Sequence, residues 1–270
     1  MTSFDPPALL ERAAACAGRP ADDVPVDGLR VGVDLGTASC VLAVVDSSGQ
    51  PVWLDSYPSG ALRDGVVVDF ARAASVVRRL RERAEEVLGV RFSGAATAYP
   101  PRIPVEDARA CSFVCESAGF DDVTLVDEVT AAQRTLAVGD GVVVDVGGGS
   151  TGVGVFRHGR LEALDDRPGG GDHLDLILAG ALGIGVEEAE ARKRSHGAES
   201  LPILVPGLQR IAESVRAMTA GAEDLPLHLA GGALMIPGAG DVLAKYLERP
   251  VMTYPHALLI TPVGIARCAA

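Results

Sequence analysis

Apolar patterns of strand length and of helix length alternate along most of this chain. From residue 29, three aliphatic runs of strand length follow one another, at 29–35, 40–46 and 51–57. The short turns GTAS and SSGQ separate them, and this spacing predicts an antiparallel meander of three strands. The pattern then predicts helix 70–89, strand 92–99, helix 107–119, strand 122–128 and helix 129–139, which Gly139 ends.

The strand–turn–strand pattern of residues 31–54 recurs at 141–164. In each copy an apolar strand ends in an aspartate, Asp34 or Asp145, and a turn of small residues leads into a second apolar strand. A repeat at so long a spacing is not a solenoid; it predicts a duplicated half-domain whose two halves face a cleft. The second copy is followed by predicted helices 172–183, 185–197 and 205–221, strand 225–229 running into a double-glycine turn at 230–233, helix 236–248, strand 251–254 and a final helix from 255. The fold class is therefore α/β.

Residues 1–28 precede this alternation and are expected to form an N-terminal extension. A short helix is predicted at 7–17, with Asp5 as its N-cap, followed by an extended linker. The remainder is expected to divide into a first lobe, 29–139, and a second lobe, 140–270. The final helix, 256–270, is expected to pack back toward the first lobe.

The composition is compatible with a folded core and limits the kinds of molecule that the protein is expected to bind. Of the 270 residues, 48% are hydrophobic and 22% charged, with a formal net charge of −12 and a sequence pI near 4.8. This balance supports a packed core, and it repels nucleic acid and anionic membrane surfaces. A nucleotide remains compatible, because backbone N–H groups and Mg²⁺ can hold its phosphates.

The five cysteines are irregularly spaced and indicate a reducing, cytoplasmic location. Cys111 and Cys115 share a face of a predicted helix, and two small buried residues are a better interpretation than a metal or redox pair. The N-terminus lacks the pattern of a signal peptide, and no apolar stretch has the length of a membrane span.

Two glycine turns are the strongest chemical signal. The first follows Asp34 and contains Gly36, Thr37, Ala38 and Ser39. The second follows Asp145 and contains Gly147, Gly148, Gly149, Ser150 and Thr151. Glycines let successive backbone N–H groups converge on an anion, and the hydroxyls can bind phosphate oxygens. An aspartate beside a phosphate favours a bridging Mg²⁺. The alternative is a pair of tight turns with Asx hydrogen bonds, but two such turns in register favour function.

Two further features are weaker on their own. Gly231 and Gly232 follow the predicted strand at 225–229 and allow close approach to the sugar side of a nucleotide, although strand-to-helix turns often need glycine. Glu128 ends a strand, as Asp34 and Asp145 do. It is a candidate to orient an attacking water, or else a charge that complements a helix dipole.

Taken in order, these segments resemble the actin, DnaK-type chaperone and sugar kinase superfamily. GVDLGTASCVLAVVD and VVVDVGGGSTGVGVF resemble its two phosphate segments, and LHLAGGALMIPG resembles its adenosine segment. VDEVTAAQRTL and PHALLITPVGIARCAA resemble its two connecting helices, so the likeness runs from about residue 29 to the end. Within the superfamily the likeness is greatest to the EutJ family of ethanolamine utilisation proteins. The shared features are the small size, LRDGVVVDF, ATAYPP, EEAEARKRS and the N-terminal extension.

The resemblance implies an actin-like ATPase fold, with two ribonuclease H-like lobes around a nucleotide cleft, and roles for individual residues. Asp34 and Asp145 would hold hydrated Mg²⁺, and the turns at 36–38 and 147–150 would grip the phosphates of ATP or ADP. Glu128 would orient the water, while Gly231 and Gly232 would approach the adenosine. Two residues of 188–194, Glu190 and Lys193, would line the adenine and ribose pocket.

Three departures from the family pattern bear on hydrolysis. Gly152 stands where DnaK-type chaperones carry a further carboxylate, and Val129 replaces the proline usual after Glu128. The chain's two lysines, Lys193 and Lys245, both come late, so the catalytic lysine of the first lobe is missing. Slow hydrolysis, or a switch that responds to nucleotide binding alone, is therefore expected.

The resemblance implies a chaperone-like nucleotide switch that acts on a protein client in ethanolamine catabolism. Assembly of enzymes or of a bacterial microcompartment is the implied setting, in the cytoplasm. Two alternatives remain at this point. A filament or scaffold protein similar to bacterial actins would need complementary heterologous surfaces. A small-molecule kinase of the same fold would need insertions that build a substrate pocket, and the chain has none of sufficient size.

Overall fold

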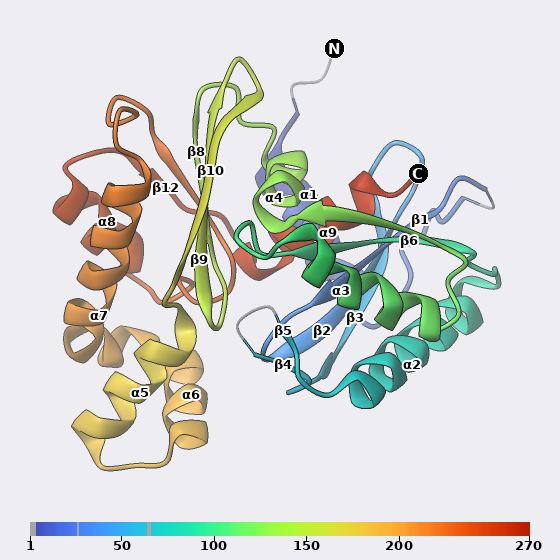
Figure 1. The fold of residues 1–270 in the computed structure, drawn as a ribbon, viewed down its shortest axis with the longest axis horizontal. Coiled ribbons are helices and arrows are strands. Elements are labelled where there is room, and N and C mark those ends of the chain that lie inside the picture. The colour runs from blue at the N-terminus through green and yellow to red at the C-terminus, as the bar shows by residue number, and fades with distance from the viewer. Residues whose placement is uncertain (1–3, 26, 64–65) are drawn as a thin grey trace. The chain divides into compact units, whose positions relative to one another are not determined.

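The computed structural model describes residues 4–25, 27–63 and 66–270. The chain divides into two compact units, of which unit 1 contains Met1–Ala137 and Leu259–Ala270 and unit 2 contains Val138–Leu258. Each unit is a sheet with helices packed on it (Figure 1). The helices formed by the described residues lack the length and apolar content that a bilayer crossing requires.

Unit 1 contains a five-stranded sheet in the order β3-β2-β1-β6-β7. Its strands are β1 (Arg30–Leu35), β2 (Ser39–Val45), β3 (Pro51–Pro58), β6 (Gly94–Tyr99) and β7 (Asp122–Asp127). Its helices are α1 (Pro6–Ala15), α2 (Phe70–Leu88), α3 (Val105–Ser117), α4 (Glu128–Leu136) and α9 (Ile260–Cys268). The small hairpin of β4 (Leu62–Arg63) and β5 (Val66–Val67) precedes α2, and the part of LRDGVVVDF at 64–65 lies outside the described residues.

Helices cover both faces of this sheet. On one face, Val31, Val33 and Leu35 of β1 join a core with apolar residues of α2 and α3. On the other face, Ala96 and Ala98 pack with α4 and α9. Gly32 permits the close approach of α9, because a Cβ on this residue would lie 2.2 Å from the backbone nitrogen of Ala266. The sheet is therefore the middle layer of three.

The N-terminal extension is part of unit 1. The predicted helix is present as α1, and its N-cap Asp5 accepts a hydrogen bond from the backbone of Ala8, as expected. Leu10 is fully buried. The chain after α1 then bonds to β3, because Leu54 N donates to Cys16 O and Gly18 N donates to Leu54 O. The extension therefore covers the free edge of β3, which ends the sheet.

Unit 2 repeats the arrangement, with a sheet in the order β10-β9-β8-β11-β12. Its strands are β8 (Gly141–Val146), β9 (Ser150–Arg157), β10 (Arg160–Pro168), β11 (Leu227–Ala230) and β12 (Val251–Met252). Its helices are α5 (Gly171–Leu182), α6 (Val186–Ser195), α7 (Gly197–Met218) and α8 (Ala239–Leu247), and the short η1 (Ala257–Leu259) leads back to unit 1. Both sheets begin with three antiparallel strands and add two parallel ones. The predicted α/β fold with duplicated halves is confirmed.

The core of unit 2 lies on one face of its sheet. Alternate residues of β8 and β9, among them Val144 and Val153, pack there with the apolar faces of α5, α7 and α8. Asp145 and Gly152 stand between these core positions, so the pleat places them on the opposite face.

Several predicted helix boundaries were wrong. Helix α4 stops at Leu136, since Ala137 already adopts the left-handed conformation with φ 51°, and Gly139 is not its end. Helix α7 begins at Gly197 instead of 205 and contains Pro202. A proline costs a helical hydrogen bond, but burial of this segment against the core outweighs that cost. The last helix begins at Ile260, after η1.

Candidate functional site

The second glycine turn joins β8 to β9 in unit 2. Asp145 lies one residue before the end of β8 and is only 7% exposed. Gly147 N donates to Ser150 O, which closes the turn. Ser150 is the first residue of β9 and is half-buried, whereas Thr151 is buried. A carboxylate and a loop of small residues thus stand together at the end of one strand, as predicted.

A glycine-rich segment, 169–172, holds this turn from one side. Gly171 N donates to Gly147 O and Asp172 N to Gly148 O, so the first amides of α5 bond to the turn. Gly169 N donates to Gly149 O in the same way. A Cβ at residue 170 would lie 2.4 Å from the carbonyl oxygen of Gly147, so glycine is needed there. Three successive carbonyls of the turn are therefore fixed.

Lys193 of α6 is buried and reaches the same segment. Its Nζ donates to Gly171 O at 3.1 Å and lies 2.8 Å from the carboxylate of Asp175 on α5. Burial raises the pKa of Asp175, and the hydrogen bond and charge of Lys193 oppose this shift. Glu190, the other residue expected near the ribose, is half-buried and pairs with Arg194 one turn further along α6.

The third glycine element follows β11 and packs against Asp145. Gly231 has φ 84°, and a Cβ there would lie 2.3 Å from Val146 O and 2.6 Å from Asp145 Oδ1. Gly232 is exposed. A cavity of ≈ 300 Å³ opens beside this turn within unit 2. Its lining includes Leu229, Gly231, Leu234, Ile236, Tyr254 and Ala257, and is mostly apolar.

The first glycine turn, in unit 1, repeats the construction of the second. Asp34 is the penultimate residue of β1 and is half-buried. Gly36 is needed for the turn, since a Cβ would lie 2.6 Å from Ser39 O. Thr37 is half-buried and Ala38 is exposed, while Ala38 O accepts a hydrogen bond from Ser59 N. The sequence thus placed equivalent turns in both units.

Glu128 is the first residue of α4 in unit 1. The preceding residue, Asp127, caps the helix by accepting a hydrogen bond from Thr130 N at 2.7 Å. Glu128 itself is half-buried. Asp127 takes the capping role, and Glu128 lies in the first turn of α4, where its charge also complements the helix dipole.

The donor groups beside the second turn fit a hard cation. Among the described residues, no group of three or more His, Cys, Asp or Glu side chains is arranged to hold a metal. Mg²⁺, however, takes one or two carboxylates and completes its shell with water and phosphate. Asp145 supplies such a carboxylate, and glycine at 231 lets the backbone after β11 approach it closely.

The cysteines do not form a metal or redox site. All five are free, and Cys111 and Cys115 are buried in the core of unit 1. Burial raises the pKa of Cys111 to about 11 and that of Cys115 to about 12. Both thiols are therefore protonated and unreactive at neutral pH, in agreement with their interpretation as small buried residues.

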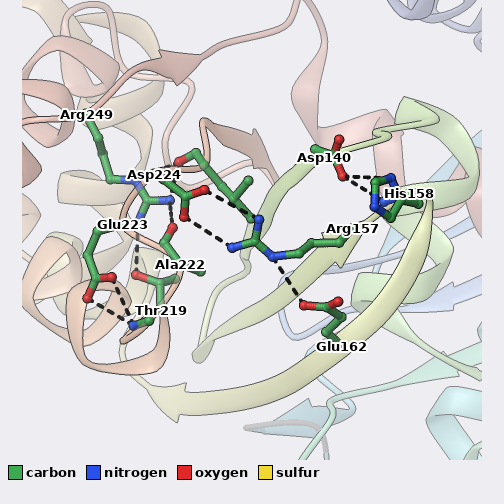
Figure 2. Close-up of polar contacts among 11 residues, drawn as sticks. Asp140, Arg157, His158, Glu162, Thr219, Ala222, Glu223, Asp224 and Arg249 are labelled. Atoms are coloured by element: carbon green, nitrogen blue, oxygen red, sulfur yellow. Dashed lines mark hydrogen bonds and ion pairs between the residues drawn. The ribbon is translucent and has the colours of Figure 1, made fainter.

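A network of charged groups lies at the other end of unit 2's sheet (Figure 2). Asp140, just before β8, accepts a hydrogen bond from His158 N, and Arg157 pairs with Asp224 and Glu162. Buried Arg249 donates to Ala222 O and to Thr219 Oγ1. Asp140 lies before the start of β8, whereas the glycine turn lies after the end of β8. This network therefore stabilises loops at the end of the sheet remote from the turn.

Two buried carboxylates were not predicted as site residues. Asp175 contacts Lys193, and Asp166 of β10 pairs in register with Gly152. Both are less than 8% exposed. Asp175 lies among apolar residues on the buried face of α5. An aspartate at a position of the apolar helix face was a signal in the sequence, because acids are rarely buried without a partner.

Comparison with known proteins defines the class. The family model described as MreB/Mbl protein matches residues 59–193. The crystal structure of MreB5 of Spiroplasma citri bound to ADP superposes with a TM-score of 0.73 at 16% identity, covering 89% of this chain and 95% of that one. These matches identify an actin-like ATPase fold.

Two closer relatives define the family. The ethanolamine utilization protein EutJ of Salmonella typhimurium is 40% identical over 262 residues, 96% of this chain and 92% of that protein. The crystal structure of EutJ from Carboxydothermus hydrogenoformans has a TM-score of 0.91 at 37% identity and covers 97% of each chain. The chain belongs to the EutJ family.

Proposed function

We propose that this protein binds ATP and ADP with Mg²⁺. The single observation that supports this most is the buried carboxylate of Asp145 beside a three-glycine turn whose carbonyls are fixed by the segment 169–172. A rigid turn can present its amide groups to an anion without reorganising. Ser150 adds a hydroxyl at the same strand end, and the MreB of the same fold is bound to ADP.

Asp145 is the residue that would hold the Mg²⁺ in unit 2. The ion would reduce the repulsion between this carboxylate and the negatively charged phosphates. Gly231 lets the backbone after β11 pack closely against Asp145, and the apolar cavity beside it is a suitable place for a flat base. We assign the turn after Asp34 the same role in unit 1, because it repeats the strand, aspartate and glycine pattern.

For hydrolysis, Glu128 is the proposed residue that orients the attacking water. It is half-buried in the first turn of α4. The first-lobe lysine of DnaK-type chaperones has no counterpart, since the chain's lysines are Lys193 and Lys245. Turnover is therefore expected to be slow, and the bound nucleotide acts chiefly as a switch.

The cellular role follows from the family. The relatives are ethanolamine utilization proteins, and we infer that this chain works in the cytoplasm in the same catabolism. A chaperone-like action on a protein client, such as an enzyme destined for a microcompartment, fits a nucleotide switch with exposed apolar side chains. Leu176, Leu182 and Val186 on α5 and α6 are such side chains, each at least 40% exposed.

Isothermal titration tests the binding proposal directly. The protein is titrated with ATP and with ADP, each with Mg²⁺ and with EDTA. Saturable binding that strengthens at least about tenfold with Mg²⁺ is expected, equivalent to roughly 1.4 kcal/mol. The absence of saturable binding of either nucleotide in the presence of Mg²⁺ contradicts the proposed function.

A further inference from the structure

Two carboxylates stand in one row across unit 2's sheet. In the antiparallel pair β8–β9, Asp145 lies directly opposite Gly152. In the pair β9–β10, Gly152 lies directly opposite Asp166. Directly opposite residues of antiparallel strands carry their side chains on the same face. Asp145 and Asp166 therefore share a face, with a residue that has no side chain between them.

The alternation of neighbouring residues supports this placement. Val144 and Val153 pair with each other and belong to the core on the other face. Asp165 pairs with Val153, so it lies on that core side of the pleat. Asp166, one residue further, returns to the face of Asp145. The register shift between Leu161 and Ala163 precedes this stretch and sets that alternation.

Both acids are buried, at 7% exposure each. Asp145 lies two residues before Gly147, and Asp166 pairs with Gly152, which follows the turn. Their backbones are two strand spacings apart, about 9.6 Å. That width is large for two side chains that ligate one ion directly through oxygens at about 2.1 Å, but it suits an ion that keeps its water shell. Mg²⁺ dehydrates reluctantly and is commonly held in this way.

We infer that Asp166 is the second carboxylate of unit 2 for the hydrated Mg²⁺ of the nucleotide, and that it contacts the ion through water. The inference rests on the proposed function. It also accounts for the departure at Gly152, where DnaK-type chaperones carry a carboxylate. In this chain an acid stands instead at the paired position on β10, and the glycine at 152 places no side chain between the two acids.

The test compares Asp166→Asn with Asp165→Asn. Each variant removes one negative charge from β10, at adjacent residues on opposite faces. Binding of Mn²⁺ to the full chain saturated with ADP is followed by electron paramagnetic resonance, and binding of ADP is measured with Mg²⁺ and with EDTA. Circular dichroism confirms that each variant is folded, and Asp166→Ser replaces Asp166→Asn if the latter is not.

For Asp166→Asn we expect Mn²⁺ affinity to fall about 10-fold to 100-fold, with unchanged ADP binding in EDTA. Asp165→Asn is expected to match the wild type. Equal Mn²⁺ affinity in all three proteins overturns the inference, as does a loss of ADP binding in Asp166→Asn that is the same with and without Mg²⁺. If the wild type itself shows no nucleotide binding, the proposed function fails, and the inference fails with it.

Discussion

Lys193 Nζ lies 2.8 Å from the carboxylate of Asp175 and 3.1 Å from the carbonyl oxygen of Gly171. Gly171 N in turn donates to Gly147 O in the second glycine turn. A single buried ammonium group thus joins α6, the start of α5 and the turn. The contacts of Lys193 in this structure are therefore those of a residue that positions the turn.

Lys193→Met is predicted to destabilise unit 2, because it leaves the Asp175 carboxylate buried without its cation. Breaking a buried pair in this way costs about 3–5 kcal/mol, which urea denaturation measures. Asp175→Asn in the same chain should recover part of the loss. Arg192→Met is the control, since the exposed pair of Arg192 with Glu199 is worth at most about 1 kcal/mol.

The same variant separates two roles of Lys193 in ligand binding. If the lysine positions the turn, Lys193→Met weakens ATP and ADP and leaves adenosine binding unchanged. A direct contact with the ribose would instead weaken adenosine and ATP by the same factor. Titration of the folded variant with all three ligands distinguishes these outcomes.

Glu85 of α2 is predicted to make stability depend on acid pH. Burial acts to raise its pKa, but hydrogen bonds from Phe92 N and Arg91 and the charge of Arg81 outweigh it, and the pKa is lowered. A carboxylate with a lowered pKa contributes stability above its unfolded pKa, about 4.3, and loses it as the pH falls through the folded value.

Glu85→Gln should therefore lower the free energy of unfolding at pH 7 and flatten its fall below about pH 5. Urea denaturation between pH 7 and pH 3.5 provides the measurement. Glu86→Gln is the matched control, because Glu86 is the next residue of α2 and is exposed. The same pH profile in both variants would show that Glu85 has no special contribution.

Gly231→Ala is predicted to impair both folding and nucleotide binding. Its positive φ and its contact with Asp145 Oδ1 leave no room for a Cβ, and strain of this kind costs about 1–3 kcal/mol. Gly180→Ala serves as a contrast, since a Cβ there has open space on helix α5. It should stabilise the protein by about 0.5–1 kcal/mol. Thermal unfolding of both variants checks the prediction, and equal destabilisation would contradict it.

Asp145→Asn and Glu128→Gln are predicted to separate binding from turnover. Asp145→Asn should weaken ADP binding in Mg²⁺ about 10-fold or more while ADP binding in EDTA stays unchanged. Glu128→Gln should keep the affinity for ATP and reduce phosphate release about 100-fold. Unaltered phosphate release in a folded Glu128→Gln variant would remove the proposed role of this residue.

The duplicated fold and the two turns were predictable because their signals are local. Strand-length apolar runs, an aspartate and glycines follow one another in the chain at both turns, and each copy supported the interpretation of the other. The pairing of Asp175 with Lys193 was not predictable, because it depends on how α5 packs against α6.

The position of Asp166 depended on register. The irregular pairing between Leu161 and Ala163 shifts β10 against β9, and a shift of one residue exchanges the faces of all later side chains. Counting residues in the sequence could not reveal it. The left-handed conformation of Ala137 at the end of α4 was similarly hidden, because glycine, not alanine, usually adopts it.

Duplication of a half-domain also duplicates its outer strand, which is β3 in unit 1 and β10 in unit 2. The edges of these two strands differ in whether another segment of the chain covers them. In unit 1 the backbone of β3 is bonded to the chain after α1, so another chain cannot add a strand there without displacing that segment. In unit 2 the equivalent strand, β10, is exposed along residues 160–164. Between these two equivalent edges, strand addition by another chain is therefore directed to β10, and the N-terminal segment makes a duplicated fold behave asymmetrically.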